Sequence, residues 1–332
     1  AAQQLPQYSQ YMLNELAINP AVSGRDEYTD MRSNIRHQWV GITDAPRTYM
    51  LSIHGPITSK HMGLGMNLFT DIVGPTRRTG LNFTYAYHLK LEDDMHLSMG
   101  LSAGLLQWGI DGSKLVLHDD GDQGLLNTYQ TTYVPDFGAG IYFHKKDEYY
   151  VGLAVPQLYQ APIALYSGSS KSSKLTSQIN VNGAYKFKLD ENFKIEPSFL
   201  MKWEHPAPLK LDLGVRGIYQ EMVWVGLSYR HKDAFVGLIG YMYKNYLLIG
   251  YSYDFTTTNI RKYSSGTHEI MLGTPAIRNL IREDKVAQMY SAIQTGGSIG
   301  MQTLDSCLTK LLSSGKISRD SAREKAKTPE NF

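Results

Sequence analysis

The stretch FKIEPSFLMKWE, residues 193–204, alternates between apolar and polar side chains along almost its whole length. One set consists of Phe193, Ile195, Pro197, Phe199, Met201 and Trp203, and the other contains Lys194, Glu196, Ser198, Lys202 and Glu204. Successive residues of a strand point to opposite faces of a sheet. The stretch therefore predicts a strand with one apolar face and one charged face.

The same alternation recurs at 209–216, 222–230 and 246–255. A soluble β-sandwich also alternates, so the pattern alone leaves two fold classes open. Three features favour a barrel that spans a membrane. The candidate strands are longer than the usual five or six residues, charges stand in mid-strand as a wet lumen tolerates, and tyrosines lie near strand ends. We predict an all-β fold, an antiparallel transmembrane β-barrel.

The chain offers fourteen candidate strands, and an even number brings both ends of an antiparallel barrel to one side. The candidates are 33–43, 47–55, 61–73, 76–90, 94–111, 135–145, 147–156, 175–189, 192–204, 208–219, 221–231, 233–243, 245–254 and 266–273. The connections expected on the periplasmic side are short, near 56–60, 91–93, 146, 190–191, 220, 232 and 244. The long connections 112–134, 157–174 and 255–265 then lie outside, which is the usual asymmetry. We expect both termini in the periplasm.

Composition excludes several classes of protein. The 332 residues carry a formal net charge of +2 without a basic or acidic block, so nothing indicates nucleic-acid binding. A single cysteine cannot form an internal disulfide or a cysteine-rich metal site. The chain opens on Ala1-Ala2-Gln3 without a methionine, as after cleavage by a signal peptidase. We expect a mature exported protein in the outer membrane.

Two segments flank the predicted barrel. Residues 1–32 include QYSQYMLNELAINPA (7–21), whose aromatic and apolar side chains favour a plug or docking segment over a disordered leader. After Gly273 the pattern changes to helical spacing, with Thr274-Pro275 as a predicted helix start. We predict a small all-helical tail over 274–332, with leucines 304, 308, 311 and 312 on one helix and Ser318 capping a last helix, 319–327.

Several separated motifs carry a resemblance to a known family. They are QQLPQYSQYMLNELAINPAVSG (3–24), RHQWVGITDAPRTYMLSIHGPI (36–57), GPTRRTG (74–80), YYVGLAVPQL (149–158) and SGTHEIMLG (265–273). In this order they resemble the PorP/SprF outer-membrane proteins of type IX secretion and gliding motility. The resemblance implies a barrel in outer-membrane lipid that works with a large secreted surface protein, or its C-terminal domain, and with periplasmic secretion components. It implies no catalysis and no cofactor.

The tail resembles a different family, the type IV pilus retraction ATPase PilT. The stretch AIRNLIRE carries that family's signature, on Ala276, Ile277, Arg278, Asn279, Leu280, Ile281, Arg282 and Glu283. PilT needs a G-x-x-x-x-G-K-[ST] loop to hold phosphates, and this chain has none, so we expect no nucleotide to bind. We interpret the chain as a join of two unrelated sequences, which is engineered, an artefact of gene assembly, or a natural fusion.

The candidate partner-binding residues are Tyr8, Tyr11, Asn19 and Pro20 in the N-terminal segment, Trp39, and Asp119, Asp120 and Asp122 in LHDDGDQG (117–124). The aspartates suit calcium chemically, but the loop lacks EF-hand spacing and a closing glutamate, so we interpret it as an exposed acidic loop and expect no metal. Charges in the lumen either mark a solute path or pair across strands. We predict a non-enzymatic barrel that holds or helps export a surface protein; the alternative is a channel for a small solute.

Overall fold

The computed structural model describes residues 5–57, 61–92, 94–114, 129–163, 173–244, 246–275, 304–314 and 318–325. The chain divides into two compact units, Ala1–Ala276 and Ile277–Phe332. The first unit is a barrel of strands, and the described part of the second is two short helices. No helix in these described ranges is long and apolar enough to cross a membrane.

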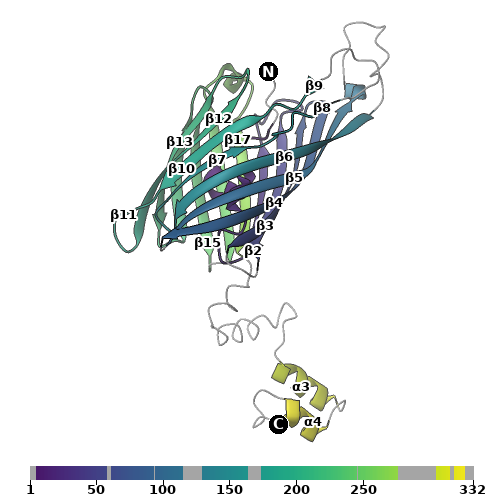
Figure 1. Ribbon diagram of the computed structural model, residues 1–332, viewed down its shortest axis with the longest axis vertical. Coiled ribbons are helices and arrows are strands. Elements are labelled where there is room, and N and C mark those ends of the chain that lie inside the picture. Colours follow the sequence, from purple (N-terminus) through teal and green to yellow (C-terminus); the bar gives the residue numbers. More distant parts are fainter. Residues whose placement is uncertain are drawn as a thin grey trace. The chain divides into compact units, whose positions relative to one another are not determined.

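The barrel is an antiparallel ring in which each strand pairs with its neighbour in the sequence (Figure 1). The strands are β1 (Asp30–His37), β2 (Arg47–Pro56), β3 (Met62–Val73), β4 (Thr76–Glu92), β5 (Met95–Asp111), β6 (Tyr129–Lys145), β7 (Tyr149–Val155), β10 (Gln178–Tyr185), β12 (Phe193–Glu204), β13 (Lys210–Tyr219), β14 (Val223–Arg230), β15 (Ala234–Tyr243), β16 (Leu247–Thr256) and β17 (Thr267–Pro275). The first strand pairs with the last, β1 with β17, and β10 pairs with β12. The ring is therefore closed, and the prediction of fourteen antiparallel strands is confirmed.

Short elements complete the ring. The two-residue strand β11 (Phe187–Lys188) continues β10 along the edge of β12, while β8 (Pro162–Ile163) and β9 (Ser173–Lys174) form a separate two-stranded sheet. The 3₁₀ turns η4 (Gly112–Lys114) and η5 (Asn259–Lys262) lie in connections between strands.

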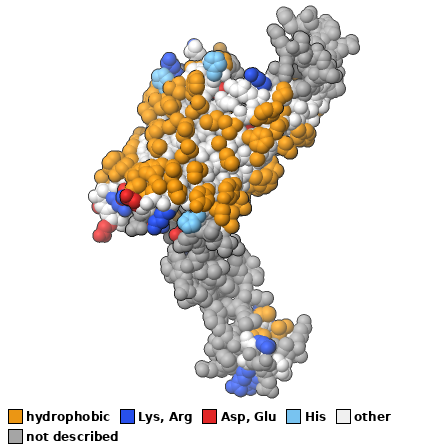
Figure 2. Space-filling view, viewed as in Figure 1, with side chains coloured by type: hydrophobic (Ala, Val, Ile, Leu, Met, Phe, Trp, Pro, Cys, Tyr) orange, Lys and Arg blue, Asp and Glu red, His pale blue; other side chains and the backbone are white. Residues whose placement is uncertain are grey.

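The outer wall of the barrel is apolar and its inner wall is polar. Along β14, Ser228 and Arg230 are buried, whereas Leu227 is 68% exposed and Val225 is 57% exposed. Apolar side chains cover the visible outer wall in Figure 2. A soluble sandwich would bury these leucines and valines, so the inverted pattern is that of a barrel wall in lipid.

Two predicted strand ends were wrong. The first strand ends at His37 instead of continuing to residue 43, because Trp39 and Asp44 adopt positive φ angles of 49° and 55° that an extended strand cannot contain. The last strand continues through Thr274 and Pro275, which pair with the start of β1. These two residues therefore end a strand and do not begin a helix, since proline is tolerated at a strand end.

The register defines two ends of the barrel. At the turn end, where β1 begins and β17 ends, all the connections between strands are short: 57–61, 93–94, 146–148, 189–192, 220–222 and 244–246. At the loop end lie the longer connections, including 112–128 and 156–177. The prediction that the turn near Lys232 belongs with the short turns was wrong, because 231–233 joins β14 to β15 at the loop end.

In the second unit, α3 (Leu304–Ser313) and α4 (Arg319–Lys325) are the described helices. The hydroxyl of Ser318 accepts a hydrogen bond from the N–H of Ser321 at 3.2 Å, which confirms the predicted N-cap. Cys307 is half-buried in α3 beside the buried Leu308. The motif 276–283 lies outside the described residues.

Candidate functional site

The N-terminal segment lies inside the ring of strands and fills its lumen. It consists of three short 3₁₀ turns, η1 (Tyr11–Leu13), η2 (Glu15–Ala17) and η3 (Pro20–Val22), joined by tight bends. The side chains that the sequence analysis selected here are buried: Tyr8 is 5% exposed, Tyr11 is 1% exposed and Asn19 is fully buried. Their contacts in the structure are with the barrel's own strands.

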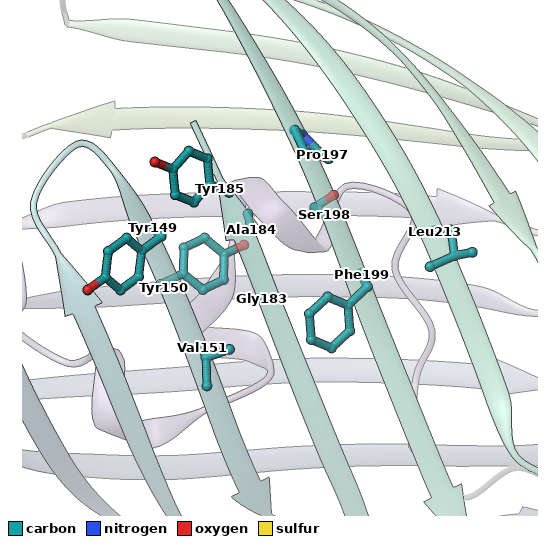
Figure 3. Close-up of a pocket in the computed structure, with 10 residues that line it drawn as sticks. All are labelled: Tyr149, Tyr150, Val151, Gly183, Ala184, Tyr185, Pro197, Ser198, Phe199 and Leu213. Atoms are coloured by element: carbon teal, nitrogen blue, oxygen red, sulfur yellow. The ribbon is translucent and has the colours of Figure 1, made fainter. Parts of the chain in front are cut away.

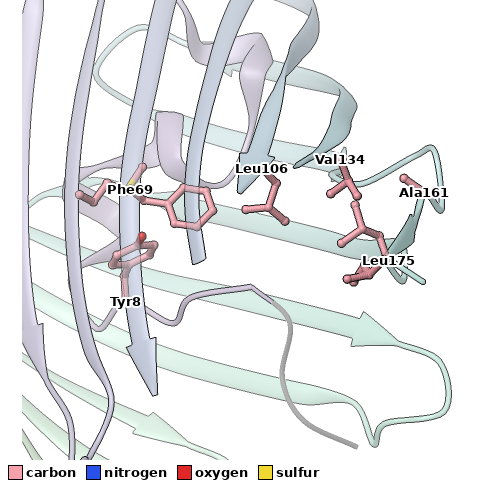
Figure 4. Close-up of a cluster of buried hydrophobic side chains, with 8 residues drawn as sticks. Tyr8, Phe69, Leu106, Val134, Ala161 and Leu175 are labelled. Carbon is pink, nitrogen blue, oxygen red and sulfur yellow. The ribbon is translucent and has the colours of Figure 1, made fainter. Parts of the chain in front are cut away.

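The segment begins near the loop end and passes down to the turn end. Tyr8 belongs to a cluster with Leu106 and Val134, which lie in the loop-end halves of β5 and β6 (Figure 4). At the other end of the segment, the Ser23 hydroxyl bonds that of Thr84 at 2.6 Å, and the Gly24 N–H donates to His54 Nδ1 at 3.1 Å. The first described residues therefore lie at the end of the barrel opposite the end of β17, which differs from the expectation that both termini share one side.

A cluster of buried charged side chains holds Ser9. We call it the luminal ionic cluster; it consists of Arg36, Asp212, Arg230, Asp254 and Glu269, each at most 5% exposed. The Ser9 hydroxyl donates to Asp254 at 2.8 Å and accepts from Arg36 at 2.7 Å and from Arg230 at 3.0 Å.

The arginines of this cluster are each shared between two carboxylates. Arg36 bonds Asp254 at 2.7 Å and Glu269 at 3.0 Å, while Arg230 bonds Asp254 at 2.9 Å and Asp212 at 3.1 Å. Buried charges are tolerated only when their hydrogen-bonding groups are satisfied. Ser9 therefore occupies a position that the cluster would otherwise leave open to water.

Glu269 also binds the backbone of the segment. Its carboxylate accepts the N–H of Ser9 at 2.7 Å and the N–H of Gln10 at 3.1 Å, and a further bond comes from Asn34 at 3.3 Å. Backbone donors that meet a carboxylate form charge-assisted hydrogen bonds, which are stronger than neutral ones. The last strand of the barrel is thereby bonded to the first residues of the chain.

Other luminal charges pair across neighbouring strands. Arg216 of β13 bonds Glu196 of β12 at 2.6 Å, and the two residues are direct partners in the strand register. Arg78 of β4 bonds Asp71 of β3 in the same way. These pairs confirm the interpretation that the luminal charges neutralise one another across strands.

The middle of the segment is fastened by Asn19, a predicted site residue. Its side-chain amide donates to the carbonyls of Ile141 at 2.9 Å and Leu153 at 3.3 Å, and its oxygen accepts the N–H of Ala21 at 2.9 Å. The neighbouring Ala21 lies directly over Gly100 of β5, where a Cβ atom would meet the Ala21 nitrogen at 2.3 Å. A glycine is needed here because the segment's backbone approaches the wall so closely.

A second polar group lies between the segment and β6. Glu15 accepts hydrogen bonds from Arg25 at 3.0 Å and from the hydroxyl of Tyr142. Burial alone lowers the pKa of Arg25, but the carboxylates of Asp26 and Glu15 outweigh it and raise that pKa well above its usual range. The guanidinium of Arg25 is therefore charged at all relevant pH values and holds η2 to the wall.

Asp26, Asp30 and His54 have the composition of a metal site, since one ligand atom from each lies within 4.8 Å of the others. Their hydrogen bonds do not fit a metal. His54 Nδ1 accepts the N–H of Gly24, so in the neutral ring the proton lies on Nε2, the nitrogen that faces Asp30 at 3.9 Å.

Arginines complete this group of carboxylates. Arg32 bonds Asp30 at 2.9 Å and Arg25 approaches Asp26 at 3.5 Å. Burial raises the pKa of Asp26, but the charge of Arg25 outweighs burial and the net pKa is lowered. The group is an ion-pair network that fastens the end of the segment to β1 and β2.

The remaining predicted site residues lie elsewhere. Trp39 is half-buried in the connection 38–46 at the loop end, where its N–H donates to the Thr267 hydroxyl at 3.1 Å. The aspartates of 117–124 lie outside the described residues. The structure therefore brings together Tyr8, Tyr11, Asn19 and Pro20 inside the lumen and does not bring Trp39 to them.

The wall also contains an apolar hollow of about 640 Å³ beside β7, β10 and β12 (Figure 3). Its lining is Tyr149, Tyr150, Val151, Gly183, Ala184, Tyr185, Pro197, Ser198, Phe199 and Leu213. None of these side chains is charged at neutral pH, so the hollow offers no group for acid–base or metal chemistry.

Comparison with known families now identifies the barrel. The family described as type IX secretion system membrane protein PorP/SprF matches residues 1–274, which include the luminal segment and every strand of the ring except the last residue of β17. The chain belongs to this family. It is accordingly an outer-membrane barrel of the type IX secretion system.

Solved structures with a similar fold are outer-membrane proteins. A FadL homologue of Pseudomonas aeruginosa is 11% identical with a TM-score of 0.45, covering 77% of this chain and 92% of its own. Omp33 of Acinetobacter baumannii is 7% identical with a TM-score of 0.46, covering 76% of this PorP/SprF chain and 100% of its own.

A short stretch is similar to proteins outside the PorP/SprF family. The type IV pilus retraction ATPase PilT of Pseudomonas aeruginosa is 73% identical over 78 residues, and a twitching motility protein of Neisseria gonorrhoeae is 46% identical over 66 residues. The matched stretches are 23% and 18% of those proteins, so the chain spans less than a quarter of the curated relatives it matches. Both stretches are longer than 274–332 and therefore include residues before Thr274.

Proposed function

We propose that this PorP/SprF barrel is a sealed, non-enzymatic receptor of the secretion machinery. It holds an exported surface protein, or its C-terminal domain, at the loop end and contacts periplasmic components at the turn end. The observation that carries the proposal is the luminal ionic cluster, in which Ser9 and the backbone of the N-terminal segment satisfy buried charges. A lumen occupied in this way favours binding at the two rims over transport through the centre.

The orientation follows the usual asymmetry of such barrels. Short turns face the periplasm and long loops face outward. The connections 112–128 and 156–177 would then lie at the cell surface, where an exported protein arrives. The N-terminal segment would pass from the outer rim to the periplasmic rim before the first strand begins.

The test is a quantitative pull-down from native outer membranes with a tagged full-length chain. We expect a large exported protein to be recovered in near-stoichiometric amount, and an unrelated barrel from the same membrane serves as the control. Recovery of the barrel alone would refute the proposal.

The competing proposal is a channel for a small solute. Several buried luminal groups lack a described hydrogen-bond partner, including both side-chain polar atoms of Asn182, and such groups favour water inside the barrel. Steady conductance of the wild-type chain in planar bilayers would support the channel, whereas a silent barrel would exclude it.

A further inference from the structure

The loop-end half of β6 has one neighbouring strand instead of two. Along its whole length β6 pairs with β5, from Tyr129 to Lys145, but it pairs with β7 only from Ala139 to Lys145. Beyond that ladder, one further bond reaches β6, from the Leu158 N–H to the Phe137 carbonyl at 2.8 Å. Within the described part of the chain, no strand covers the other edge of β6 from Tyr129 to Asp136.

The alternation of hydrogen bonds shows which backbone groups face this edge. The Phe137 carbonyl points away from β5, and a strand's backbone groups alternate in direction with each residue. The N–H and C=O groups of Tyr129, Thr131 and Tyr133 therefore also point away from β5. Pro135 occupies the next such position, where its missing N–H costs the β5 ladder nothing, and this placement is typical of an edge strand.

The lumen side of this half-strand is covered, but its edge is not. Val134 points inward and packs in one cluster with Ala161, Ile163 and Leu175, which come from and around the β8–β9 hairpin (Figure 4). The side chains at the edge positions point outward instead, with Tyr129 55% exposed and Tyr133 64% exposed.

Exposed strand edges normally carry a device that prevents pairing, such as a charge or a bulge. The sequence YQTTY, residues 129–133, contains no charged residue, and its pairing with β5 is regular. We propose that this edge of β6 binds an extended segment of the exported partner, which adds to the barrel as a further strand.

The proposal rests on the proposed function and specifies its partner chemistry. The backbone of the added segment supplies the hydrogen bonds, and the uncharged side chains of Thr131 and Tyr133 favour β-branched or aromatic residues beside them. The segment must be free of proline at the positions that face the edge, because proline has no N–H to donate.

A second copy of the barrel does not fit this edge. Two copies in one membrane are related by an axis along the membrane normal, and barrel strands tilt by roughly 35–45° from that normal. The two β6 strands would then cross at about twice the tilt and could not form a ladder. The occupant is therefore an extended segment of a different chain.

The first test uses the exported protein that the pull-down recovers as its probe. Thr131→Pro removes an edge-facing N–H without touching the β5 ladder, as Pro135 already does, and Thr131→Val alters the side chain but keeps the N–H. We expect Thr131→Pro to lower the recovered partner at least tenfold and Thr131→Val to stay within twofold of wild type, with both variants heat-modifiable. Equal recovery by Thr131→Pro and wild type would overturn the proposal and leave the proposed function intact.

If the wild-type pull-down recovers no exported protein, the proposed function fails and crosslinking decides the edge separately. A photoreactive benzoylphenylalanine replaces Tyr133 in native membranes, and the matched control replaces Phe235, which is 55% exposed at the loop end of β15 but paired on both edges. A polypeptide adduct from position 133 alone supports an added strand. No such adduct, or equal adducts from both positions, overturns it.

Discussion

Replacing Glu269 with glutamine tests whether the N-terminal segment is an integral part of the barrel. Glu269 is fully buried and accepts four hydrogen bonds, from the N–H groups of Ser9 and Gln10 and from the side chains of Asn34 and Arg36. Each carboxylate oxygen accepts two of them. A glutamine places an NH₂ group against two of these donors, so two bonds are lost and the charge that strengthens the others disappears.

The expected cost follows from the pairing that remains. Removing one partner of a buried ion pair costs about 3–5 kcal/mol. Arg36 keeps its second carboxylate, Asp254 at 2.7 Å, so we expect the lower limit, about 3 kcal/mol or roughly a hundredfold in the unfolding equilibrium. The control is Glu221→Gln, which removes an ion pair with Lys194 at an exposed turn and should cost about 0.5 kcal/mol.

The measurement is equilibrium unfolding by urea in lipid vesicles, followed by fluorescence of the chain's four tryptophans. Limited proteolysis of the N-terminal segment accompanies it, and the segment should be cleaved faster in Glu269→Gln. If Glu269→Gln and Glu221→Gln unfold within 1 kcal/mol of each other, the luminal ionic cluster does not hold the segment and the reasoning fails.

Three further outcomes follow from the fold. Gly100→Ala should destabilise the barrel by about 1–3 kcal/mol in the same urea assay, because the new methyl group collides with Ala21, whereas Gly237→Ala, which meets open space, should change stability by less than about 0.5 kcal/mol. Deleting residues 5–24 should convert a silent barrel into one with steady conductance in planar bilayers; a deletion variant that folds and stays silent would contradict a lumen filled by this segment. Trypsin treatment of source membranes should release YSSGTHEIMLGTPAIR, residues 263–278, if the join with the PilT-like tail exists as protein; barrel peptides without it would show that the join does not.

The strands could be predicted from sequence because each one carries its own local signal. In FKIEPSFLMKWE the period of two identifies the strand, its lipid face and its lumen face without reference to any other segment. Strand ends were harder, since Trp39 and Asp44 leave the extended conformation for reasons of local turn geometry. The side on which the 231–233 turn lies was predicted wrongly because its length resembles that of the turns at the opposite end.

The luminal ionic cluster could not be predicted in the same way. Ser9 and Glu269 are 260 residues apart, and Arg36 and Asp254 are 218 apart, so no local pattern joins them. Asp254 and Glu269 did stand on the polar faces of predicted strands, which was the available signal. Only the closed ring brings those faces to a common point and shows that the segment lies there.

The path of the N-terminal segment has a consequence for assembly. The segment precedes β1, and β1 forms the closing seam with β17, so the segment must be in place before or while the seam forms. Sliding β17 by one residue would turn Glu269 toward lipid and strip the N–H groups of Ser9 and Gln10 of their acceptor. The beginning of the polypeptide thus proofreads the registration of its final strand, and a mis-threaded molecule fails at the last step of closure instead of surviving as a mispaired barrel.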